Sequence, residues 1–138
     1  MPTRILIADD DPTIRLLLRR LLEQKQPDWE VCGDASNGRE AIERVEQLEP
    51  DVVVMDLGMP VMTGLQAAPE IARTHPTLPM LLISVQQVSK QLAREARRAG
   101  YRGAVTKSCG TEVIRGIEAL LKQETFFYAE DGSVASAL

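Results

Sequence analysis

Apolar and polar positions along the chain divide it into two kinds of segment. In four short runs nearly every residue is apolar and turn residues or charges follow, which is typical of fully buried strands. A fifth run alternates well enough to be a strand. The predicted strands cover residues 4–8, 29–35, 52–55, 80–84 and 103–106. After each strand, apolar residues recur at helical spacing. The predicted helices cover residues 12–26, 39–48, 65–74, 89–99 and 111–122.

Strands that alternate with helices predict right-handed crossovers and a parallel sheet covered on both faces. We therefore expect an α/β fold, a doubly wound (βα)₅ domain with five parallel strands in a three-layer sandwich. The domain should cover residues 1–124, and residues 125–138 should form a tail. Within the tail, we expect the aromatic run at residues 126–128 to pack on the domain and the end to fray.

Two of the predicted helices have unusual features. Pro69 lies within the third helical pattern. A proline inside a helix costs about 3 kcal/mol but is tolerated in the first turn, so we expect this helix to start late or to be kinked. The helix over residues 89–99 has only four apolar residues to bury. Such a thin stripe indicates a loosely held element.

Composition adds bounds on the class of protein. The 138 residues suit one domain, and the net charge of -4 argues against nucleic-acid binding by this chain alone. Cys32 and Cys109 have neither metal-ligand nor disulfide spacing, which fits a reducing compartment. No secretory leader is visible, and no apolar segment could span a membrane. We therefore expect a cytoplasmic protein without a membrane partner.

Chemically active groups stand at the ends of four predicted strands: Asp9 and Asp10, Asp56, Ser84, and Lys107. Since the strands are parallel, these groups should emerge at one edge of the sheet. Carboxylates that crowd together need a cation or shared protons, and Mg²⁺ prefers carboxylate, water and phosphate oxygens. Asp56 could attack a phosphoryl group, Lys107 could pair with the transferred phosphate, and Ser84 could donate a hydrogen bond to it.

A purely structural role for each of these residues stays open. Asp9 and Asp10 would also suit a helix N-terminus. Lys107 and Asp56 could form a structural ion pair, and Ser84 could merely end a strand.

Several motifs resemble the response-regulator receiver domain of two-component signalling, which has the CheY-like fold. They are ILIADD, VVVMDLGMP with a following glycine, LLIS and VTK, in this order and each at a strand end. The resemblance covers nearly the whole chain. It implies the strand order 2-1-3-4-5 and a phosphorylation-dependent switch that accepts a phosphoryl group from a sensor histidine kinase.

The resemblance also implies a role for each site residue. Asp56 would be the phosphoacceptor, and Asp10 and Asp56 would bind Mg²⁺ with the Gly58 backbone carbonyl. Asp9 would assist through water. Ser84 would be the switch hydroxyl and Lys107 the phosphate partner. Phosphorylation would change the surface of the fourth helix, fifth strand and fifth helix. Such a protein catalyses its own modification and is not a turnover enzyme.

A narrower resemblance concerns the process that the switch would control. The stretches IADDDPTIR and AGYRGAVTKS and the tail KQETFFYAEDGSVASAL are similar to NarL/LuxR-type transcription regulators. In those proteins a tail of this kind leads into a helix-turn-helix DNA-binding domain, which this chain lacks. The chain is then a piece of a longer regulator or a stand-alone receiver, and the tail favours the first. Homodimerisation is a further expectation.

Three positions depart from the family pattern. Ala104 stands where a switch tyrosine or phenylalanine is usual, and Tyr101 nearby could substitute for it. Val85 replaces the usual alanine or glycine, which predicts slower exchange with small phosphodonors. Gly58 has no side chain with which to steer a hydrolytic water.

Three other functions remain as alternatives. A receiver that works as a phosphate-independent interaction module is compatible with Ala104. A phosphohydrolase of the haloacid-dehalogenase type would need a second acid where Gly58 stands. A flavodoxin-like FMN carrier would place its phosphate beside the acids at residues 9–11, which would repel it.

Overall fold

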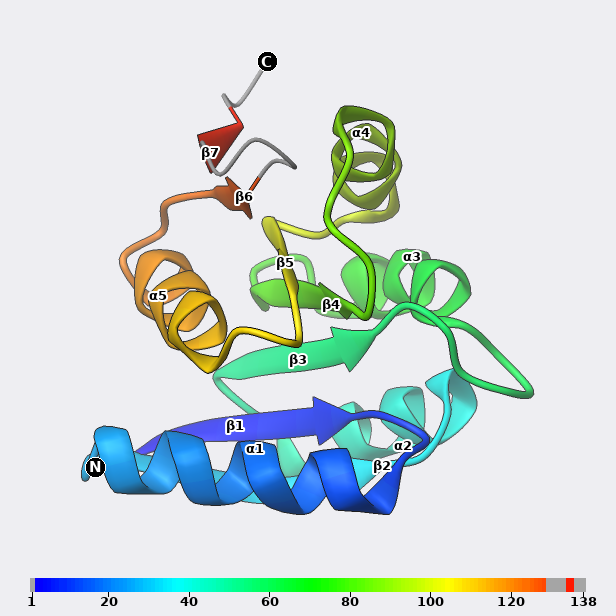
Figure 1. Cartoon of the computed structure of the whole chain (residues 1–138). Coiled ribbons are helices and arrows are strands. Elements are labelled where there is room, and N and C mark those ends of the chain that lie inside the picture. Colours follow the sequence, from blue (N-terminus) through cyan, green and yellow to red (C-terminus); the bar gives the residue numbers. More distant parts are fainter. Residues whose placement is uncertain (1, 129–133, 136–138) are drawn as a thin grey trace.

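The computed structural model describes residues 2–128 and 134–135 and shows a twisted sheet between two layers of helices (Figure 1). The strands are β1 (Thr3–Ala8), β2 (Trp29–Ala35), β3 (Val52–Asp56), β4 (Met80–Ser84), β5 (Gly103–Thr106), β6 (Phe126–Tyr128) and β7 (Val134–Ala135). The helices are α1 (Pro12–Lys25), α2 (Gly38–Leu48), α3 (Gly64–Thr74), α4 (Lys90–Ala99) and α5 (Gly110–Leu121).

The sheet has the strand order β2-β1-β3-β4-β5-β6-β7. All neighbouring pairs from β2 to β6 are parallel, and β7 pairs antiparallel with β6. The predicted fold class and the order of the first five strands are therefore confirmed. The sequence pattern did not predict β6 and β7, which extend the sheet beyond β5.

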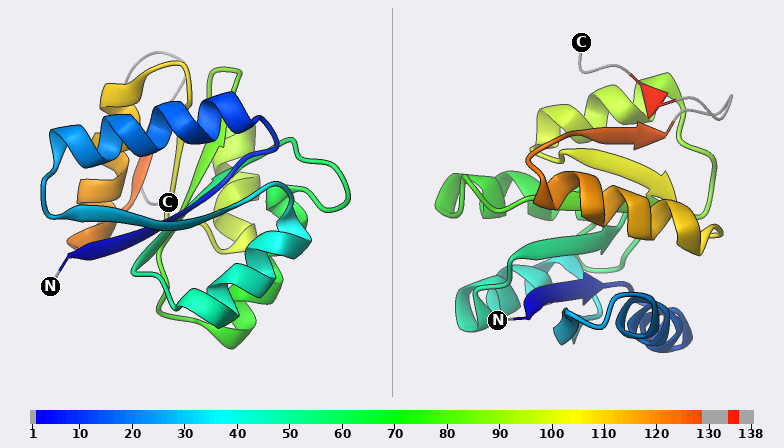
Figure 2. Two further views of the ribbon diagram at one scale, coloured as in Figure 1. Left: turned by 90° about the horizontal axis from the view of Figure 1, so that it is seen from below. Right: turned by 90° about the vertical axis from the view of Figure 1, so that its left-hand side faces the viewer.

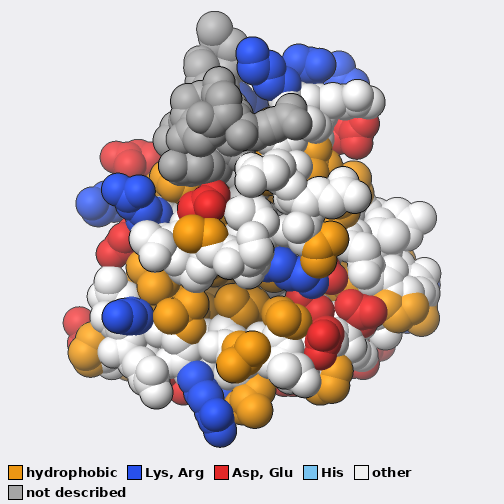
Figure 3. All heavy atoms as spheres, viewed as in Figure 1, with side chains coloured by type: hydrophobic (Ala, Val, Ile, Leu, Met, Phe, Trp, Pro, Cys, Tyr) orange, Lys and Arg blue, Asp and Glu red, His pale blue; other side chains and the backbone are white. Residues whose placement is uncertain are grey.

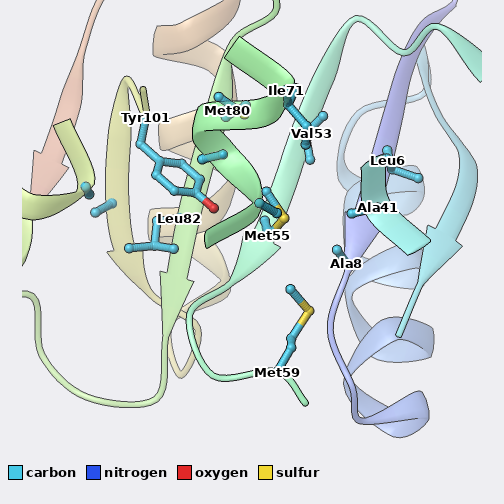
Figure 4. Close-up of a cluster of buried hydrophobic side chains, with 14 of the residues drawn as sticks. Leu6, Ala8, Ala41, Val53, Met55, Met59, Ile71, Met80, Leu82 and Tyr101 are labelled. Atoms are coloured by element: carbon cyan, nitrogen blue, oxygen red, sulfur yellow. The ribbon is translucent and has the colours of Figure 1, made fainter. Parts of the chain in front are cut away.

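Helices cover both faces of the sheet (Figure 2), and each face carries its own apolar core. On one face, α1 and α5 pack over alternate residues of the central strands, such as Ile7 and Val54. On the other face, α2, α3 and α4 cover the intervening residues, such as Met55 and Leu82 (Figure 4). Because the central strands are buried on both faces, their sequences read as continuous apolar runs.

Capping side chains fix where the helices begin. The Asp11 carboxylate accepts a hydrogen bond from the backbone N–H of Thr13 at the start of α1. Thr63 and Gln66 form a reciprocal capping box at the start of α3. The box satisfies two backbone donors at the helix start, so α3 begins at Gly64 and Pro69 lies inside it. The late start predicted for this helix is wrong, and the alternative of a kink at Pro69 stays a prediction.

Helix α4 buries few apolar residues, whereas the tail after α5 is anchored by a buried aromatic ring. In α4 only Ala93 and Ala96 are buried, which confirms the thin apolar stripe. The tail packs on the domain as expected, because Phe127 is fully buried and Phe126 is partly buried. The expected fraying of the end falls largely on residues outside the described part of the chain. Within that part, no helix is both long and apolar enough to cross a bilayer.

Candidate functional site

The predicted site residues gather at the carboxyl ends of β1, β3, β4 and β5. The register of the sheet brings them together, since Asp56 lies beside Ile83 and Ser84 lies beside Thr106. An open hollow of about 380 Å³ lies over this edge. Its lining comprises Asp10, Asp11, Asp56, Leu57, Gly58, Ser84, Val85, Gln86 and Lys107. In Figure 3 acidic side chains gather over this edge, beside basic and apolar ones.

Three carboxylates form the centre of the site. One oxygen from each of Asp9, Asp10 and Asp56 lies within 4.8 Å of the others. Asp9 and Asp56 are buried, whereas Asp10 is exposed. Hard oxygen donors at this spacing suit a divalent cation such as Mg²⁺. The structure therefore brings together three of the predicted metal ligands, and their role in metal binding stays a prediction.

Lys107 forms ion pairs with both buried carboxylates. Its Nζ lies 2.9 Å from Asp9 Oδ2 and 3.3 Å from Asp56 Oδ2. Burial raises the pKa of Asp56, and the nearby charge of Asp9 raises it further, while Lys107 opposes both effects. For Lys107, burial favours the neutral amine, but the hydrogen bond to Asp9 and the two carboxylate charges outweigh it and raise its pKa. The ammonium is thus shared by two acids.

Asp9 is tied more directly than the sequence predicted. Its side chain accepts hydrogen bonds from Lys107 Nζ and from the backbone N–H of Asp11. Its backbone carbonyl accepts a hydrogen bond of 2.7 Å from Arg15. Asp9 therefore orients Lys107, a role that sequence reasoning missed. The polar residues at the strand ends predicted that these side chains lie close together. They could not show that Asp9 pairs with Lys107.

Ser84 and Gly58 flank the phosphoacceptor position. Ser84 is buried, and its Oγ accepts a hydrogen bond of 3.1 Å from the backbone N–H of Gln86, at the start of the β4–α4 loop. The Gly58 backbone N–H hydrogen-bonds to Asp56 and lowers the pKa of that carboxyl. Val85 is 72% exposed at the rim of the hollow. A serine hydroxyl that now holds the loop could turn toward a group on Asp56.

Tyr101 lies behind the site and is fully buried. Its hydroxyl donates a hydrogen bond of 2.8 Å to the backbone carbonyl of Gly64 at the start of α3. A Cβ at Gly64 would lie 2.3 Å from the Asp56 backbone oxygen and 3.0 Å from the Tyr101 hydroxyl. Tyr101 and Ala104 belong to the same buried cluster, so Tyr101 supplies an aromatic ring to the core that contains Ala104. The tyrosine links the region behind Asp56 to the end of α4.

Comparisons with known proteins agree with this geometry. Residues 5–119 match the response regulator receiver domain family. The chemotaxis protein CheY of Thermotoga maritima is 35% identical over 122 residues, covering 88% of this chain and 98% of CheY. A protein-glutamate methylesterase/protein-glutamine glutaminase of Methanosarcina acetivorans is 39% identical over 109 residues, covering 79% of this chain. This chain spans 30% of that enzyme's length.

Solved structures give the same result. A LuxR-family response regulator from Aurantimonas sp. superposes with a TM-score of 0.87 at 32% identity, covering 95% of this chain and 92% of the other. The signal receiver domain of the putative response regulator NarL from Mycobacterium tuberculosis superposes with a TM-score of 0.79 at 29% identity. The match covers 88% of this chain and 97% of the other. Together with the matching family and the confirmed sheet order, these similarities identify the chain. It belongs to the receiver domain family of two-component response regulators.

Proposed function

We propose that this chain is a phosphorylation-dependent switch that accepts a phosphoryl group from a sensor histidine kinase on Asp56. The observation that carries the proposal is the position of Lys107, whose ammonium lies 2.9 Å from Asp9 and 3.3 Å from Asp56. A positive charge held beside a buried carboxylate is suited to receive the oxygens of a phosphoryl group.

The chemistry is a displacement at phosphorus. A carboxylate oxygen of Asp56 attacks the phosphorus atom, a P–O bond forms, and the bond from phosphorus to the donor's imidazole nitrogen breaks. The electron pair of that bond leaves with the imidazole, which takes up a proton. Lys107 then pairs with a phosphoryl oxygen, and Ser84 turns from the Gln86 amide to donate a hydrogen bond to another. The protein modifies itself once and is not a turnover enzyme.

A magnesium ion fits the donor set of the site. Asp10 and Asp56 would hold it, with the Gly58 backbone carbonyl as a further ligand and Asp9 acting through water. When bound, Mg²⁺ would neutralise negative charge on the phosphoryl oxygens. Asp10, the exposed member of the cluster, would be the ligand that meets the cation where the cluster reaches solvent.

The proposed output is a change in the surface formed by α4, β5 and α5. Residues 1–124 would form the receiver and residues 125–138 the start of a linker to a DNA-binding domain. Homodimerisation would follow from the same surface change. The similarity to a LuxR-family regulator over 95% of this chain supports transcriptional control as the output.

The test is the intact mass after incubation with acetyl phosphate and Mg²⁺. The wild type should gain one phosphoryl group, and Asp56→Asn should gain none. Asp28→Asn, which removes an exposed carboxylate remote from the cluster, should behave as the wild type. If the wild type gains no mass and beryllofluoride also fails to bind, the proposal is wrong.

One other function has a specific observation in its favour. Lys107 already pairs with both buried carboxylates and offsets part of their charge, as a structural ion-pair cluster would. A receiver with such a cluster could act as a phosphate-independent interaction module. The mass measurement separates the two functions, because the module would show no phosphoryl adduct.

A further inference from the structure

Strand β6 lies between α4 and α5, with β5 on one side and the short strand β7 on the other. It runs parallel to β5, with Phe126 opposite Gly103 and Phe127 opposite Ala104 (Figure 1). The backbone N–H of Phe126 donates a hydrogen bond of 2.9 Å to the carbonyl of Arg102. A Cβ at Gly103 would lie 2.6 Å from the Phe126 carbonyl oxygen. The close approach of β6 therefore depends on a glycine in β5.

The two phenylalanines of β6 anchor it to opposite faces of the sheet. Phe126 packs against the core beneath α5. Phe127 is fully buried in the core beneath α4, where the small side chain of its neighbour Ala104 leaves space for the ring. The guanidinium carbon of Arg97, in the last turn of α4, lies 4.4 Å from the centre of the Phe127 ring. The packing of β6 against the sheet therefore depends on the position of α4.

A short path joins this strand to the phosphoacceptor. Ser84 holds the first turn of the β4–α4 loop through the Gln86 amide. Farther along that loop, Val88 is buried in the same cluster as Phe127. The only buried residues of α4 are Ala93 and Ala96, and Leu92 and Ala99 are partly buried, so the apolar surface that opposes its displacement is small. If Ser84 turns toward a phosphoryl group on Asp56, the loop loses this bond and α4 can shift over Phe127.

We propose that β6 is a built-in occupant of the α4–β5–α5 surface and that phosphorylation of Asp56 releases it. This inference rests on the proposed function. While β6 is seated, the edge of β5 is covered by the chain's own backbone, and a partner reaches it only after Phe127 leaves. The same movement would reposition the residues that follow α5. The state of Asp56 would therefore be transmitted to the C-terminal segment by the strand itself.

The first measurement uses the wild-type chain with beryllofluoride and Mg²⁺ as the probe. Binding is followed by ¹⁹F NMR, and exchange of the Phe126 amide hydrogen by two-dimensional NMR. Allosteric couplings commonly amount to about 5-fold or more, so saturating beryllofluoride should accelerate exchange of this amide about 5-fold. The amide of Leu82 in central β4 serves as an internal reference, because its rate should change much less.

The second measurement uses reciprocity. If beryllofluoride favours the released state of β6, a substitution that also favours this state must tighten beryllofluoride binding, by at most the ratio of its affinities for the two states. Phe127→Leu should therefore bind the probe several-fold more tightly. Val45→Ala, which removes buried volume from α2, is the matched control and should bind like the wild type. Beryllofluoride that binds the wild type with no change in Phe126 exchange would overturn the inference alone. Failure of beryllofluoride to bind would overturn it together with the proposed function.

Discussion

Replacing Lys107 by methionine would remove the positive charge that two buried carboxylates share. The side chain of Lys107 is 10% exposed, that of Asp56 6%, and that of Asp9 is fully buried. At an effective dielectric constant of about 20, attractions across 2.9 and 3.3 Å are each about 5 to 6 kcal/mol before desolvation is subtracted. Removing one partner from a buried pair costs about 3–5 kcal/mol net.

We expect Lys107→Met to lower the free energy of unfolding at pH 7 by about 3 kcal/mol, the lower end of that range. The loss is limited because Asp56, whose pKa is already raised by burial and by Asp9, can take up a proton once the ammonium is gone. An acid whose pKa is raised on folding contributes least stability when it is ionised, so the deficit of the variant should shrink as the pH falls from 7 to 5.

The assay is urea unfolding followed by the fluorescence of Trp29, the single tryptophan, which is buried in the described structure. Lys122→Met, which removes an exposed lysine, should change stability by less than about 0.5 kcal/mol. Adding Asp9→Asn to Lys107→Met should restore more than half of the loss. A deficit below about 1 kcal/mol, or one that does not depend on pH, would refute the shared-ammonium interpretation.

Four further outcomes are expected. Mg²⁺ at about 100 times its dissociation constant should stabilise the wild type by about 2.7 kcal/mol in thermal unfolding, and Asp10→Asn should greatly reduce this effect. Gly64→Ala should lower unfolding free energy by more than about 2 kcal/mol, because its Cβ would meet the Asp56 backbone at 2.3 Å; a variant as stable as wild type in urea would contradict this. Tyr101→Phe should cost about 1–2 kcal/mol in the same assay, since it removes the hydrogen bond that the buried hydroxyl donates to the Gly64 carbonyl, and a smaller loss would indicate that water replaces the bond. Val85→Ala should accelerate phosphorylation by acetyl phosphate, because the side chain stands 72% exposed at the rim of the hollow; an unchanged rate would remove the proposed obstruction.

The parts of this fold that sequence predicts well are those where one physical effect dominates. The strand that ends at Asp56 is buried throughout, so a run of apolar residues followed by an acid located both the strand and the site. Helix starts are also fixed locally, since Asp11 and Ser89 accept hydrogen bonds from the first turns of α1 and α4.

The parts that sequence missed depend on competition between effects or on long-range contacts. The capping box of Thr63 outweighed the disfavoured Pro69, so α3 begins earlier than the proline alone suggests. Lys107 and Asp9 are 98 positions apart, and only the folded sheet determines that the ammonium reaches both acids. Strand β6 has three residues, which is too few to show an alternation of apolar and polar positions. It forms because it pairs with the edge of β5, a contact that the sequence pattern does not show.

The seating of β6 has a practical consequence for work on isolated receivers of this type. A chain trimmed after residue 124 would lose Phe127, leaving an unfilled hole beneath α4, and would uncover the hydrogen-bonding edge of β5. Open strand edges recruit other strands, so the trimmed protein would be prone to pair edge to edge with its own copies. Dimers seen with such a fragment would then form without phosphorylation, and their abundance would not report the state of Asp56.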